Sequence, residues 1–94
     1  MTELDQARAV IDEIDREIAA LFTKRFEAVR TIIAYKIEHD LPVYVPGREA
    51  EIIAANTRRI TDEKVREHFR EVYLAILRES KLYQQEIARE KGIQ

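Results

Sequence analysis

The sequence predicts an all-α protein whose protomer has three helices, the first of them very long. The 94 residues include 46% hydrophobic residues but only two glycines and two prolines. This composition is typical of a helix-rich domain rather than a disordered or all-β chain. Both prolines lie in the segment LPVYVPG, the clearest break in the chain. We therefore expect residues 1–94 to form a single helical domain.

The first helix is predicted to begin near Thr2, which resembles the start of a capping box with Asp5. It continues without glycine or proline to about His39 or Asp40, and Pro42 prevents much further extension. Its apolar residues follow the 3,4,3,4,3 spacing of a heptad stripe. The stripe consists of Leu4, Ala7, Ile11, Ile14, Ile18 and Leu21.

The length of this helix predicts a homodimer. About 37 helical residues span roughly 55 Å, whereas a compact globule of this chain length has a radius of gyration near ~12 Å. The helix should therefore extend beyond its own protomer. Because an exposed apolar stripe of that length needs a cover, we expect the long helices of two copies to pack together.

Two shorter helices are predicted after the break. One runs from Arg48 to about Thr57, and the other begins after an N-cap at Thr61 and reaches about Glu90. The spacing in the last helix predicts one buried face, which Ser80 and Gln84 continue at i+4 intervals. Its apolar members are Val65, Phe69, Val72, Ile76 and Ile87.

Charge and composition exclude several function classes. Sixteen basic and eighteen acidic residues give a net charge of -2, so no broad basic surface for nucleic acid is expected. The chain has no cysteine, and its two histidines are isolated, so no metal site is expected. No apolar run approaches the ~20 residues of a membrane span, and the N-terminus lacks a signal-peptide core. We expect a cytoplasmic protein that contacts neither membrane nor nucleic acid.

Three cations on the first helix suggest a local site for an anion. Arg25 occupies the next position of the apolar stripe, and Lys36 follows eleven residues later, about three turns and roughly 16 Å along the same side. Their long side chains could converge on one small anion. Arg8 lies seventeen residues before Arg25, roughly 25 Å away, so it could reach that anion only from another subunit. Taken singly, each cation is also typical of a surface residue whose stem packs while its head stays in water.

Polar residues of the other two helices are compatible with the same site. Arg48 and Glu49 lie beside the apolar face of the second helix, near its N-terminus, where the helix dipole adds weak positive potential. Ser80 and Gln84 are expected to face inward from the third helix. Taken individually, Arg48 and Glu49 are compatible with a solvated turn, and Ser80 and Gln84 with hydrogen-bonded polar groups in the core. Their coincidence with Arg25 and Lys36 favours a binding site.

The order of these residues resembles the all-helical class of chorismate mutases over essentially the whole chain. The resemblance is carried by Arg8, the segment IDEID, Arg25, Lys36, the segment PVYVPGRE and the segment SKLYQQ. It implies an intertwined homodimer of three-helix protomers with two identical sites, each completed by Arg8 of the other chain. The remaining positions that match the site of the family are Arg25, Lys36, Arg48, Glu49, Ser80 and Gln84.

The resemblance implies conversion of chorismate to prephenate, a unimolecular rearrangement that needs no nucleophile, metal or cofactor. Positioning and electrostatics must then supply the catalysis. Arginines Arg8, Arg25 and Arg48 suit the two carboxylates of the substrate. Lys36 and the Gln84 amide can donate hydrogen bonds to the ether oxygen as its bond breaks.

One position departs from the pattern of the family. Val45 stands where many members have an aspartate near the C4 substituent of the substrate, although Glu49 could accept a hydrogen bond from a C4 hydroxyl. Two related activities therefore stay open, rearrangement of 4-amino-4-deoxychorismate and pyruvate elimination from isochorismate. The alternative of another class is a non-enzymatic helical dimer acting as a regulatory or scaffold module, which explains the stripe but not the inward polar residues.

Overall fold

The computed structural model describes residues 1–92 and contains three helices: α1 (Glu3–Glu38), α2 (Arg48–Thr57) and α3 (Glu63–Glu90). The all-helical class and the bounds of the helices agree with the sequence prediction to within one or two residues. Strands do not occur among the described residues. The last two residues of the predicted domain, 93 and 94, lie outside the described part of the chain.

Hydrogen bonds at both ends explain where α1 begins and stops. At the start, the Thr2 hydroxyl accepts from the Asp5 backbone N–H, and the Asp5 carboxylate accepts from the Thr2 N–H, which completes the predicted capping box. At the end, Asp40 has a φ of 52°. The N–H groups of Asp40 and Leu41 then bond to the carbonyls of Ile37 and Lys36, at 3.3 and 2.8 Å. These two bonds form a Schellman motif in which an aspartate replaces the usual glycine.

The predicted N-cap of the third helix was wrong by one residue. Asp62, not Thr61, caps α3, and its carboxylate accepts a hydrogen bond of 3.0 Å from the Val65 N–H. Asp62 has the extended backbone of an N-cap, with ψ at 121°, and a carboxylate also suits the positive end of the helix dipole.

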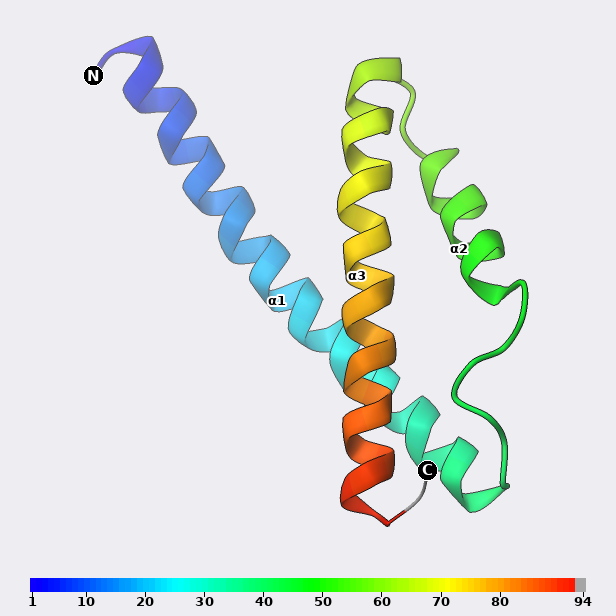
Figure 1. The fold of residues 1–94 in the computed structure, drawn as a ribbon. Coiled ribbons are helices and arrows are strands. Elements are labelled where there is room, and N and C mark those ends of the chain that lie inside the picture. Colours follow the sequence, from blue (N-terminus) through cyan, green and yellow to red (C-terminus); the bar gives the residue numbers. More distant parts are fainter. Residues whose placement is uncertain (93–94) are drawn as a thin grey trace.

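α3 lies between the other two helices and contacts both. In Figure 1, α1 passes obliquely behind α3, near the C-terminal part of both helices, and α2 runs beside α3 on the side where α1 ends. The chain therefore buries little: its hydrophobic core consists of Val29, Ile33, Ile53, Leu77, Ile87 and Ala88.

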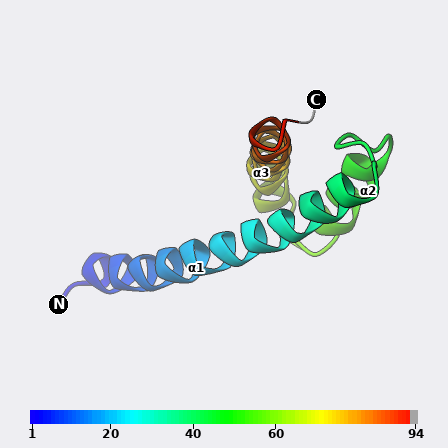
Figure 2. The ribbon, with the colours of Figure 1, turned by 90° about the horizontal axis from the view of Figure 1, so that it is seen from below.

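The protomer is elongated, as the length of its first helix predicted. Its radius of gyration is 16.9 Å and its longest dimension 55 Å, against about 12 Å expected for the radius of gyration of a compact globule. Figure 2 shows the N-terminal half of α1 projecting away from the other two helices. All six residues of the apolar stripe are exposed.

The predicted buried face of α3 is only partly correct. Ile87 is buried and Phe69 and Ile76 are half-buried, but Val65 and Val72 are 53% and 59% exposed. These two valines lie in the N-terminal half of α3. Helical spacing identifies an apolar face, but the packing of the other two helices decides how much of that face one chain covers.

Candidate active site

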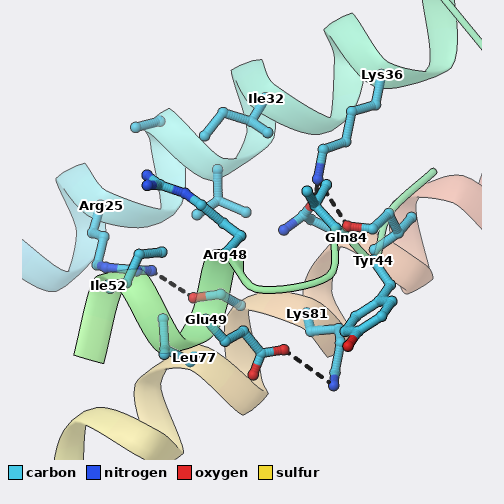
Figure 3. Close-up of a pocket in the computed structure, with 15 residues that line it drawn as sticks. Arg25, Ile32, Lys36, Tyr44, Arg48, Glu49, Ile52, Leu77, Lys81 and Gln84 are labelled. Carbon is cyan, nitrogen blue, oxygen red and sulfur yellow. Dashed lines mark hydrogen bonds and ion pairs between the residues drawn. The ribbon is translucent and has the colours of Figure 1, made fainter. Parts of the chain in front are cut away.

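A pocket of about 270 Å³ opens between the three helices and the segment that joins α1 to α2. Its volume lies just below the range for small-molecule sites, about 300–1,000 Å³. Six of the seven predicted site residues line it, from all three helices (Figure 3). They are Arg25, Lys36, Arg48, Glu49, Ser80 and Gln84.

Lys36 and Gln84 form one wall of the pocket. The Lys36 Nζ donates hydrogen bonds to the Gln84 Oε1 at 3.0 Å and to the Val43 carbonyl at 2.9 Å. An ammonium has three N–H donors, so one is left for a ligand. Because the Gln84 oxygen accepts from Lys36, its NH₂ group is also left to donate. Burial lowers the pKa of Lys36 below its ordinary value, since desolvation disfavours the charged form.

Arg25 is held at the opposite wall by contacts with α3. Its Nη1 donates to the Ser80 Oγ at 2.5 Å, and the Ser80 hydroxyl donates to the Ile76 carbonyl at 2.8 Å. The Arg25 guanidinium also lies 5.7 Å from the centroid of the Tyr73 ring, within cation–π range. Ser80 is itself buried. The serine therefore positions the guanidinium, and one of the five N–H donors of Arg25 is used in doing so.

The start of α2 supplies a further cation and the only carboxylate among the lining residues. Gly47 precedes it with a φ of 83°, a conformation that favours glycine. The exposed Arg48 extends from this point toward α1 (Figure 3). Glu49 is half-buried, and its Oε1 lies 3.4 Å from the Nζ of Lys81.

Lys81 lines the pocket but was missed by the sequence analysis, as was Tyr44. The signal for Lys81 was present: Leu77, Ser80, Lys81 and Gln84 stand at i, i+3, i+4 and i+7, one face of a helix. Tyr44 lies in the irregular segment before α2, where no periodicity could predict its position. With Lys81 included, four cations and one carboxylate surround the pocket, a balance that favours an anionic ligand.

Arg8 is not part of this pocket within one chain. It lies on the exposed N-terminal half of α1, roughly 25 Å along the helix from Arg25. Val45 also lines the pocket and contributes an apolar side chain there.

Residues 1–92 contain no cluster of three or more potential metal ligands among their His, Cys, Asp and Glu side chains. None of the helices formed by these residues is both long and apolar enough to cross a membrane.

Comparisons with known proteins agree on one family. Residues 7–85 match the model of the family described as chorismate mutase type II. The chain is 42% identical over 64 residues to a T-protein of Haemophilus influenzae. These aligned residues make up 68% of this chain and 16% of that relative. It is 36% identical over 58 residues to a T-protein of Enterobacter agglomerans, covering 62% of this chain and 16% of the relative.

A third relative is a bifunctional chorismate mutase/prephenate dehydratase of Aquifex aeolicus, 42% identical over 52 residues, or 55% of this chain and 14% of the relative. The chain thus spans about a sixth of the length of the curated relatives it matches, 16% in the first two. No solved structure matches the chain.

Proposed function

The chain belongs to the type II chorismate mutase family, and we propose that it converts chorismate to prephenate in the pocket between its three helices. One observation carries this proposal: Arg25, Lys36 and Gln84, from two different helices, line one small pocket with Arg48 from a third. A dicarboxylate with a breaking ether bond needs cations at one end and hydrogen-bond donors at the ether oxygen, and the pocket offers both.

The proposed mechanism uses positioning and charge alone. Arg25 and Arg48 bind the two carboxylates through their planar arrays of N–H donors and select the compact conformer in which the reacting carbons approach. As the carbon–oxygen bond breaks, negative charge grows on the ether oxygen. The remaining N–H of Lys36 and the NH₂ group of Gln84 donate to that oxygen. Because both donors are already held by the hydrogen bond between them, little reorganisation is needed in the transition state.

Glu49 and Val45 define the remaining part of the pocket. Glu49 is the only carboxylate among the lining residues, and its Oε2 takes no part in the contact with Lys81. We propose that it accepts the hydrogen bond of the C4 hydroxyl. Val45 adds no second acceptor, and this is the specific reason to test 4-amino-4-deoxychorismate and isochorismate beside chorismate.

We further propose that two copies of the chain form an intertwined homodimer in which Arg8 of one copy completes the site of the other. Two observations support this. The apolar stripe of α1 is exposed along its whole length, and a patch of that kind commonly marks an interface. Arg8 also lies too far along the helix to reach the pocket of its own chain.

The crossing arginine can be tested by mixing two inactive variants, Arg8→Ala and Arg25→Ala. If Arg8 acts across the interface, each mixed dimer contains one intact site and one doubly altered site. Random exchange makes about half of the dimers mixed, so the activity should rise to about a quarter of the wild-type value. If Arg8 acts within its own chain, the mixture should show only the average of the two variants.

The reaction itself is tested by identifying products. Purified protein is incubated separately with chorismate, isochorismate and 4-amino-4-deoxychorismate, each against its uncatalysed control, and the products are separated by chromatography. We expect prephenate from chorismate. Salicylate with pyruvate from isochorismate, or rearrangement of the amino compound alone, would reassign the substrate. No turnover of any compound would favour the non-enzymatic helical dimer.

A further inference from the structure

We infer that Lys81 is a specificity-determining residue, which makes the Glu49 end of the pocket reject ligands that carry a cation there. The inference rests on the proposed function, because it concerns which substituent the substrate presents to Glu49. No such role is expected from helical spacing alone. It follows from what the Lys81 ammonium contacts.

The Lys81 ammonium is held between a carboxylate and an aromatic ring. Its Nζ lies 3.4 Å from the Glu49 Oε1 and 5.9 Å from the centroid of the Tyr44 ring. The side chains of Lys81 and Glu49 are 38% and 44% exposed, so both are partly screened from water by the pocket. The ring face attracts the cation as well. Figure 3 shows this pair at the end of the pocket away from Lys36.

The rest of the pocket is suited to other groups of the substrate, so the Glu49 end is left for the substituent at C4 of chorismate. Arg25 and Arg48 suit carboxylates, and the Lys36–Gln84 pair suits the ether oxygen. Glu49 is the only lining carboxylate, so the hydroxyl of the substrate, its one neutral donor, finds its acceptor there. Lys81 can at the same time donate to the oxygen of that hydroxyl. A hydroxyl therefore satisfies both members of the ion pair.

An ammonium in the place of the hydroxyl meets a different environment. It has no lone pair to accept from Lys81, and it would compete with Lys81 for the same carboxylate. Because Val45 contributes no acceptor, Glu49 cannot share the two positive charges with a second lining carboxylate. Like charges held together at a binding site disfavour the complex. The ion pair thus selects a hydroxyl over an ammonium.

The test compares chorismate with 4-amino-4-deoxychorismate, whose amine is protonated at neutral pH. The ratio of kcat/KM for the two compounds is measured for the full wild-type chain and for Lys81→Met, which keeps the length of the stem but removes the charge. Lys81→Arg keeps the charge. Lys64→Met is the matched control, because Lys64 lies on the same helix but is exposed and does not line the pocket.

We expect the preference for chorismate to fall about tenfold in Lys81→Met, since a like-charge contact is removed. The preference should be retained in Lys81→Arg and in Lys64→Met. Circular dichroism melting of each variant checks that the fold is intact. An unchanged ratio in Lys81→Met, or an equal fall in Lys64→Met, would overturn the inference while leaving the proposed reaction untouched.

The affinities of the chain for chorismate and 4-amino-4-deoxychorismate, measured by calorimetry, test the role of Lys81 independently of turnover. If the wild-type chain rearranges neither compound but binds both, a preference that is lost in Lys81→Met supports the role of Lys81 and rejects the reaction. If the wild-type chain neither rearranges nor binds either compound, the inference and the proposed function are both wrong.

Discussion

The two halves of α1 belong to one helix but have opposite surroundings. Every residue from 3 to 24 is exposed. From Arg25 to Glu38 the same helix buries Val29 and Ile33 and lines the pocket with Arg25 and Lys36. The boundary lies where α1 begins to cross α3 (Figure 1). Within one chain, α1 thus has buried residues only where a second helix is present.

The two halves of α1 also carry cations of two kinds, some held in place by partners and some exposed. Lys36 is half-buried and donates to two partners, and Arg25 is held by a serine and an aromatic ring. Lys24, on the N-terminal half, is exposed, and so is Arg8 within one chain. A cation that is already desolvated and held in place can stabilise developing charge, whereas a cation in water cannot do so without reorganisation.

The largest expected effect is on kcat, and it distinguishes Lys36, which is held by hydrogen bonds, from the exposed Lys24. Lys36→Ala removes a preorganised donor and should lower kcat by about 10²- to 10³-fold. Lys24→Ala, twelve residues earlier on the same helix, should leave kcat near the wild-type value. Steady-state kinetics with chorismate measures both. Equal activity of the two variants would remove Lys36 from the proposed site.

Two isoleucine substitutions test whether a second copy of the chain covers the N-terminal half of α1. Ile33 is 1% exposed, so Ile33→Ala should lower the free energy of unfolding by about 2–5 kcal/mol. Ile18 is 57% exposed in one chain. If a second copy covers it, Ile18→Ala should also destabilise, and the melting temperature should depend on protein concentration.

Urea denaturation and sedimentation at several concentrations measure both isoleucine variants. A neutral or slightly stabilising Ile18→Ala, with a melting temperature independent of concentration, would contradict the homodimer. That result is the one expected of an exposed helical position, because alanine has the higher helix propensity.

The lowered pKa of Lys36 predicts an alkaline limit to activity. Only the protonated amine carries the charge that stabilises the ether oxygen, so activity is lost as the pH rises through this pKa. Since kcat/KM reports ionisations of the free enzyme, it should decline at a lower pH than an exposed lysine would require. Lys36→Arg keeps its charge to higher pH and should remove this decline. The same decline in Lys36→Arg would assign it to another group.

The smallest expected effect is on the free energy of unfolding and concerns Asp40, just after the C-terminal end of α1. Asp40 has a φ of 52°, in the left-handed region. This costs a non-glycine residue about 1–2 kcal/mol, and glycine loses about 0.5–1 kcal/mol more chain entropy on folding. Asp40→Gly should therefore stabilise the chain by roughly 0.5 kcal/mol. The control Ala34→Gly, at an exposed position inside the helix, should destabilise it by about 1 kcal/mol. Thermal melts of both variants at equal concentration decide the sign.

The sequence by itself determined the helices and six of the residues that line the pocket. Local chemistry marks the ends of the helices: the capping box at Thr2 and the break around Pro42 act over a few residues, so they can be read without the fold. The inward positions of Ser80 and Gln84 likewise follow from helical periodicity. The roles of the six predicted lining residues remain predictions, but their placement around one pocket agrees with the spacing that suggested them.

Only the tertiary structure decided which apolar residues are buried and which charges meet. Val65 and Val72 have the spacing of a buried face, yet they are exposed within one chain. The contact of Lys81 with Glu49 joins residues 32 positions apart. No local pattern encodes such a contact, because it depends on the angle and position at which three rigid helices pack. Periodicity determines the face a residue occupies, and packing determines what that face meets.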